Sequence, residues 1–202
     1  MSEATRPQSP PEFLRSKVAS RFRDMVKKAD QKVAQAQREA EDLRGAKGSI
    51  GWEISDGSRA KWFINISDGE MTVTETAAHE PFMTIALSEA DWARFASRAN
   101  AGAMLTLDDR PFGKARIDRV RVIKGTLRAV VTGLPEGGDF RADVHFGRER
   151  SAEPKATVQI PADIVPELQS GALNPQAAFM QGRIKLIGDM AFAMQLGMAL
   201  AL

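Results

Sequence analysis

The spacing of apolar residues changes along this chain, from a helical period to a period of two. From Glu12 to Arg44 there is neither glycine nor proline, and apolar residues recur at intervals of three and four. These residues are Phe22, Val26, Ala29, Val33, Ala36, Ala40 and Leu43. The pattern predicts an amphipathic helix over residues 12–44. Residues 1–11 are polar and hold three prolines, so we expect them to be disordered.

The same stripe has the spacing of a coiled-coil seam. The helix could therefore pack on its own domain or pair with another chain, and the pattern leaves both open. About three heptads, with mostly alanine and valine in the seam, would make a weak coiled coil in isolation. Residues 12–44 are thus a candidate interface for a partner protein or a second copy.

From Ile50 onward, alternating apolar and polar residues predict a series of strands with glycine turns between them. The predicted strands are 50–57, 61–69, 70–76 and 82–87. Ser88 is placed to cap a short helix that follows, Glu89 to Ala96. This order returns in residues 127–133, 140–147, 153–160 and 162–169. We therefore expect one domain over residues 49–202, with possible repeats 50–124 and 125–202; a single antiparallel sheet with an inserted hairpin is the alternative.

The C-terminal segment, residues 174–202, is poor in charge and rich in methionine. Pro175 after Asn174 favours a helix start, and Gly182 favours its end. A short strand should follow, after which Asp189 can cap a last helix that is apolar on nearly every face. Such a helix is expected to be buried in protein or against an apolar ligand. It is too short to cross a membrane.

This segment resembles the sterol carrier protein type 2 family. The resemblance rests on an ordered series of residues between Gly171 and the last helix. The series is Gly171, Asn174-Pro175, Ala178-Phe179, Gly182 with alternating basic and apolar residues, and Gly188-Asp189. It extends loosely upstream to Gly51 and does not include the helix of residues 12–44. In the first half, Arg110 to Ile117 stand in roughly the corresponding place.

The resemblance implies an α+β fold, in which a mainly antiparallel sheet and helices on one face enclose an apolar tunnel. In that family the tunnel holds fatty acyl chains, acyl-CoA, sterols or similar lipids. The family has no catalytic residues of its own when the domain stands alone. The domain also occurs as an accessory piece of enzymes and enzyme complexes.

Eight residues of the C-terminal segment are the candidate ligand-binding wall. They are Phe179, Met180, Ile184, Met190, Phe192, Met194, Gln195 and Met198. Periodicity alone would favour an ordinary closed core, whereas the all-round apolarity of the last helix and the family resemblance favour a cavity. A buried Gln195 amide would need a partner, such as a ligand head group, but the side chain could equally point to water.

Other chemistry is weakly represented in the sequence. There is no cysteine and no metal-binding histidine motif, so we expect no metal or cofactor. No GxSxG motif is present, and Asp108-Asp109 is typical of a turn, so we expect no catalysis. The basic excess lies in residues 1–48, which argues against nucleic acid as a partner of the remainder.

A second basic cluster follows the middle of the chain, at Arg116, Arg119, Arg121 and Lys124. We interpret Arg119 and Arg121 as one face of a strand, where charge guards a sheet edge. Contact with anionic lipid or a CoA phosphate is the alternative, and Arg183 with Lys185 has the same two interpretations.

The sequence therefore predicts a non-catalytic, cytoplasmic lipid-binding or lipid-transfer protein. Its ligand would be a fatty acyl chain, acyl-CoA, a sterol or an isoprenoid-like lipid. The alternative is an accessory or assembly subunit that docks a partner or second copy through residues 12–44. A third possibility is peripheral contact of this helix with a membrane surface, which its alanine-rich stripe without tryptophan makes the weakest of the three.

Overall fold

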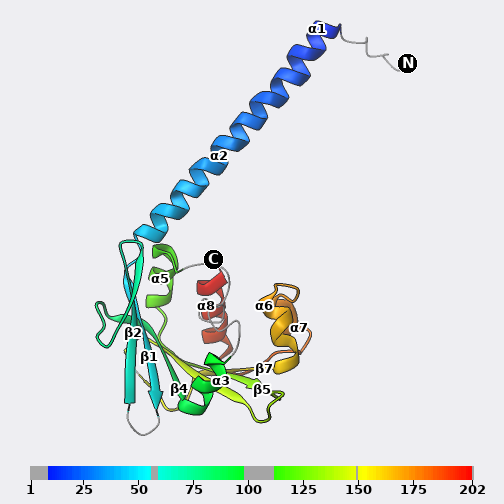
Figure 1. Cartoon of the computed structure of the whole chain (residues 1–202). Helices are drawn as coiled ribbons and strands as arrows, with labels where there is room; N and C mark the ends of the chain where they lie inside the picture. Colours follow the sequence, from blue (N-terminus) through cyan, green and yellow to red (C-terminus); the bar gives the residue numbers. More distant parts are fainter. Residues whose placement is uncertain (1–8, 56–58, 98–111, 149, 202) are drawn as a thin grey trace. The chain divides into compact units, whose positions relative to one another are not determined.

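The computed structural model describes residues 9–55, 59–97, 112–148 and 150–201 (Figure 1). The predicted turn at Asp108-Asp109 and the start of the Arg110 segment lie outside these residues. The chain divides into two compact units, Met1–Glu41 and Asp42–Leu202.

The N-terminal segment is helical from Pro10 to Arg44. It comprises α1 (Pro10–Phe13), one wider π-helical stretch (Leu14–Val18) and α2 (Ala19–Arg44). The helix thus begins two residues earlier than predicted, because proline is tolerated in a first helical turn. The expectation of disorder is therefore wrong for Pro10 and Pro11, and residues 1–8 lie outside the described part. No described residue of α2 is buried.

The second unit is built on an eight-stranded sheet. Its strands are β1 (Gly48–Ser55), β2 (Arg59–Ser67), β3 (Glu70–Thr74), β4 (Pro81–Ser88), β5 (Gly125–Thr132), β6 (Phe140–Phe146), β7 (Ala156–Pro161) and β8 (Lys185–Gly188). Their order is β3-β2-β1-β4-β6-β5-β7-β8. Among the described strands, β1–β4 and β5–β7 are parallel pairs and the other neighbours are antiparallel. The predicted α+β fold with a mainly antiparallel sheet is therefore confirmed.

Five described α-helices accompany this sheet. They are α3 (Glu89–Ala96), α5 (Lys114–Arg121), α6 (Val165–Gln169) after a 3-10 turn (Ala162–Ile164), α7 (Pro175–Met180) and α8 (Met190–Ala201). Ser88 caps α3 as predicted, since its hydroxyl accepts a hydrogen bond from Asp91 N at 3.1 Å. These helices lie on one side of the sheet (Figure 1).

The two halves of the sheet repeat one strand arrangement. In the first half, β1 lies between an antiparallel β2 and a parallel β4, and in the second, β5 lies between an antiparallel β6 and a parallel β7. The halves join because β4 pairs with β6. Strand β3 belongs only to the first half. The arrangement is consistent with the predicted internal duplication.

Buried polar pairs at matching positions support the same conclusion. Ser49 on β1 lies opposite Asn65 on β2, and the Ser49 hydroxyl donates to Asn65 Oδ1 at 2.6 Å. Thr126 on β5 lies opposite His145 on β6, with Thr126 Oγ1 2.9 Å from His145 Nδ1. All four residues are buried. Each pair satisfies polar atoms that would otherwise be costly to bury.

The predicted strand face at Arg119 and Arg121 is wrong, because these residues lie on helix α5. Ile117 and Val120 are three residues apart and fully buried, which is the spacing of a helix face. Arginine and valine alternate at positions 119–122, and this period of two is also that of a half-buried strand. Arg116 is buried as well, with its guanidinium 5.0 Å from the centre of the Phe112 ring.

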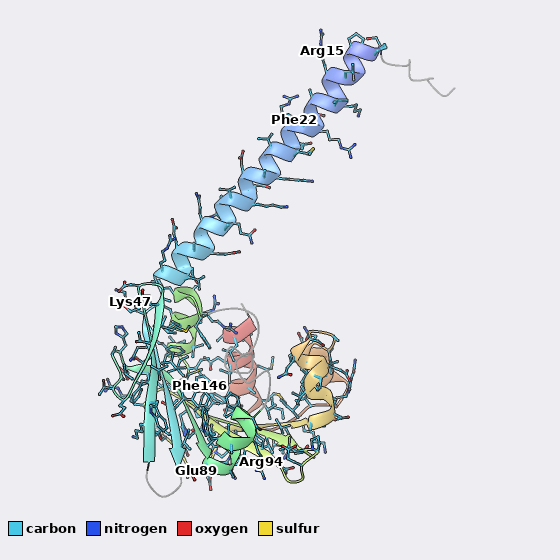
Figure 2. All side chains as sticks on the ribbon, viewed as in Figure 1. Arg15, Phe22, Lys47, Glu89, Arg94 and Phe146 are labelled. Carbon is cyan, nitrogen blue, oxygen red and sulfur yellow. The ribbon has the colours of Figure 1, made fainter. Side chains whose placement is uncertain are left out.

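The apolar interior consists of two clusters. The larger one joins the sheet to α3, α5 and α8, and includes Phe146, which Figure 2 labels. The smaller one lies around α6, α7 and β7, and its buried members are Ile164, Leu173, Ala178 and Ile184. The last helix therefore shares its core with the first half of the sheet, whereas α7 packs in the smaller cluster with α6 and β7.

Candidate ligand-binding surface

Short-range hydrogen bonds fix the C-terminal motif. Asn174 Oδ1 accepts from Gln176 N at 2.8 Å and caps α7, with Pro175 in the first turn as predicted. Asp189 Oδ1 accepts from Phe192 N at 2.9 Å and caps α8. Between them, Gly188 has φ 99°, and a Cβ there would lie 2.4 Å from the Lys155 carbonyl oxygen. Only glycine fits this turn.

Helix α8 has two apolar faces with different surroundings. Phe192, Leu196 and Ala199 are 5%, 3% and 7% exposed and belong to the larger core cluster. Met190, Met194 and Met198 are 42%, 62% and 60% exposed. They are spaced by four residues and therefore share one side of the helix, here called the α8 methionine face. An exposed row of large apolar side chains is a feature of ligand and partner surfaces.

The other predicted wall residues divide between core and surface. Ile184 is buried in the smaller cluster, and Phe192 is buried in the larger one. Phe179 and Met180 are exposed at the end of α7. Gln195 is exposed too, so its amide can bond to water and burial does not require a ligand partner for it. The role of all eight residues in ligand binding stays a prediction.

A pocket of about 240 Å³ opens elsewhere in the second half. It is lined by Thr132, Gln159, Pro161, Asp163, Ile164, Gly182, Arg183 and Lys185. Ile184 and the other predicted wall residues do not line it. Because charged side chains, Asp163, Arg183 and Lys185, are part of its lining, this pocket differs from the apolar tunnel that the family resemblance implies.

Two of the basic residues considered for head-group contact, Arg183 and Arg121, already have partners. Arg183 donates to both carboxylate oxygens of Glu167, at 2.9 Å each. This hydrogen bonding lowers the pKa of Glu167 and raises that of Arg183. On α5, Arg121 bonds to Asp118 and to the Lys47 carbonyl oxygen. These contacts favour a structural role over contact with an anionic head group.

Sequence reasoning missed the buried polar pairs on the other side of the sheet. Burial lowers the pKa of His145 below its ordinary value. Asp143, which forms two hydrogen bonds with Arg128, and Glu53 act in the opposite direction. No local sequence signal marks these pairs, because they depend on which residues face one another across neighbouring strands.

Two features are absent from the described residues. Among them, no group of three or more histidine, aspartate or glutamate side chains is placed to hold a metal ion. No helix in the described ranges is long and apolar enough to span a membrane.

Comparisons with known proteins agree with the fold. The model of the SCP-2 sterol transfer family matches the chain twice, over residues 26–110 and 112–201. The first match includes part of α2, which the resemblance seen in the sequence had left out. Two matches in tandem also agree with the repeated strand arrangement. No curated protein sequence matches the chain.

Solved structures similar to this chain include two sterol carrier proteins and a ubiquinone synthesis protein. Sterol carrier protein 2 like 2 from Aedes aegypti is 20% identical with a TM-score of 0.30, and the match covers 54% of this chain and 87% of that chain. The sterol carrier protein domain 2 of Helicoverpa armigera is 21% identical with a TM-score of 0.22, covering 82% and 72%. A ubiquinone synthesis protein, UbiJ-SCP2, is 18% identical with a TM-score of 0.34, covering 55% and 96%. Since the two family matches together span most of its residues, the chain belongs to the SCP-2 sterol transfer family.

Proposed function

We propose that this protein binds and carries an apolar lipid without catalysing a reaction on it. Proteins of the SCP-2 sterol transfer family are generally lipid carriers. The observation that supports the proposal most is the α8 methionine face, Met190, Met194 and Met198, which stands exposed on a helix without any charged residue. Phe179 and Met180 of α7 add exposed apolar surface from the same motif.

Physical chemistry favours an apolar ligand at this face. Burial of one large apolar side chain is worth about 1.5–3 kcal/mol relative to its exposed state. Three methionines can therefore contribute substantially when a lipid covers them. Methionine is flexible and polarizable, so its side chain can fit acyl chains and sterol rings alike. Gln195 is exposed next to Met194 and could donate a hydrogen bond to a ligand carbonyl or hydroxyl.

The ligand classes that fit are fatty acyl chains, acyl-CoA, sterols and isoprenoid-like lipids. In this proposal the C-terminal helix covers the ligand, and no cofactor takes part. A carrier of this kind would work in the cytoplasm. We include an apolar tunnel in this proposal. Its predicted wall residues lie partly on the surface and partly in the core.

Ligand uptake tests the proposal directly. Purified protein is expected to retain a lipid in native mass spectrometry or to bind a fluorescent fatty acid. The double change Met194→Gln with Met198→Gln should weaken probe binding by about tenfold, since it removes most of the apolar area of the face. Met71→Gln on β3 is the matched control, because Met71 is similarly exposed but lies in the first half. Absence of bound lipid together with absence of probe uptake would refute the proposal.

A second candidate function is that of an accessory or assembly subunit. It is favoured by α2, a helix of 26 residues with no buried residue among those described. A long helix with an exposed apolar stripe gains stability when that stripe packs against another chain. In this role the helix would dock another protein chain while the second unit presents a lipid or serves as a scaffold.

A further inference from the structure

We infer that α2 pairs with the α2 helix of a second copy of this chain, as a parallel, in-register, two-stranded coiled coil. The inference rests on the docking role proposed above and names the partner. Its starting point is the apolar stripe of α2. Phe22, Val26 and Val33 are 66%, 46% and 57% exposed, and Leu43 is 38% exposed. Figure 2 labels Phe22 on this helix.

The spacing of this stripe assigns the positions of a heptad repeat, abcdefg. Val26, Val33 and Ala40 fall at position a, and Phe22, Ala29, Ala36 and Leu43 fall at position d. Valine at position a combined with leucine at position d favours two strands, and this combination is present at the C-terminal end of the seam, with Val33 at a and Leu43 at d. Alanine at the intervening layers lets two helices approach closely. The seam runs through nearly the whole length of α2, from Ala19 to Arg44.

Flanking charges favour a second copy in parallel orientation. In a parallel pair, each g residue faces the e residue five positions later on the other helix. The facing pairs within α2 are Met25 with Asp30, Lys32 with Gln37 and Glu39 with Arg44. The last pair is attractive, occurs twice by symmetry, and no pair has like charges. Gln35 Nε2 donates to Glu39 Oε1 at 2.9 Å, which leaves Glu39 Oε2 for the second copy.

The antiparallel orientation is less compatible with the same residues. There, e residues face e residues, which brings Arg23 opposite Arg44 of the second copy. This repulsion occurs twice and offsets the attraction between Lys32 and Glu39.

Solution mass is the first test and uses the full chain. Light scattering should give a concentration-dependent mass that approaches twice the 22.0 kDa of one chain. Val33→Glu places a charge in the seam and should raise the dimer dissociation constant by at least about tenfold. Gln31→Glu introduces the same charge at position f, on the opposite side, and should leave it unchanged. Probe uptake by the Val33→Glu variant should match the unaltered protein.

Orientation is tested with single cysteines, since the chain has none of its own. In the parallel pair, Val26→Cys lies beside its own copy and should form an interchain disulfide under mild oxidation. Lys27→Cys, at the outer b position, should not. In an antiparallel pair, Val26→Cys would crosslink only with Leu43→Cys, in a mixture of the two variants.

Three results would overturn the inference. A monomer at all concentrations would do so, and if another protein then bound α2, the docking role would survive without a second copy. A dimer unaffected by Val33→Glu would place the contact elsewhere. A disulfide found only in the mixture with Leu43→Cys would establish the antiparallel orientation. Loss of lipid uptake alone would concern the lipid-binding proposal and not this one.

Discussion

The two halves of the sheet have the same frame but different continuations. After β4, the first half continues to α3 and then to α5, which has four lysines and arginines among its eight residues. After β7, the second half continues through α6, α7 and β8 to α8, which has no charged residue. The strand frame is therefore common to the two halves, while the charge of the last helix differs between them.

The halves also differ in the strand that pairs with the third strand of the frame. In the second half β7 pairs with β8 of its own half, whereas in the first half β4 pairs with β6 of the other. The pairing of β4 with β6 thus joins the two halves through strand edges that would be open in each half alone. An open edge strand is prone to aggregation, so this pairing also protects the sheet.

The largest expected effect tests whether the two faces of α8 differ. Phe192→Ala should lower the free energy of unfolding by about 3–5 kcal/mol, because it opens a cavity in the core beside Phe146. Met194→Ala should change it by no more than about 0.5 kcal/mol, since that side chain is exposed. Urea unfolding measures both. Similar losses for the two variants would mean that α8 is buried on both faces.

The next effect compares the buried hydroxyl pairs of the two halves. Ser49→Ala and Thr126→Val should each cost about 1–3 kcal/mol, because each leaves a buried partner without its hydrogen bond. Ser49 should cost more, since its hydroxyl also accepts from His79 N at 3.1 Å. Urea midpoints measured in parallel give the ranking. An unchanged urea midpoint for Thr126→Val would mean that the hydrogen bond between Thr126 and His145 does not stabilise the fold.

A smaller effect separates the halves by pH, because His145 titrates and its counterpart Asn65 does not. The folded pKa of His145 is depressed by burial, so the unfolded chain binds the proton more readily. The contribution of neutral His145 to the free energy of unfolding is fully present above the unfolded pKa of about 6.5. It is lost as the pH falls from there toward the folded pKa. The slope of stability cannot exceed about 1.4 kcal/mol per pH unit for one proton. His145→Gln should reduce the change in urea midpoint between pH 7 and pH 5. Asn65→Gln should leave that pH dependence as it is in the unaltered protein.

The smallest expected effect concerns the surface pair Glu167–Arg183 of the second half. Glu167→Gln should leave the urea midpoint unchanged within error, because solvent screens an exposed ion pair. The control is Ile164→Ala, a buried neighbour of the same small cluster, which should lower the midpoint clearly. A large loss from Glu167→Gln would indicate that the pair anchors α6 to the C-terminal motif.

Local chemistry made several elements predictable. Ser88, Asn174 and Asp189 have side chains that cap a helix wherever the following residues can form one, and all three do so. The strands alternate because one side of the sheet is covered by helices. The prediction failed at Arg119 and Arg121, because a run of only four alternating residues fits both a strand and an amphipathic helix. The buried spacing of Ile117 and Val120 resolves it.

The sequence by itself determined the helical N-terminal segment, the strands, the caps of the C-terminal motif and the family. These depend on contacts between residues that are near one another in the chain. Tertiary structure decided that β4 pairs with β6, that α8 shares a core with the first half, and that Met190, Met194 and Met198 remain exposed while Phe192 is buried. A helix that is apolar all round gives no local signal for which side meets the sheet. Only the packing of elements distant in the sequence selects that side.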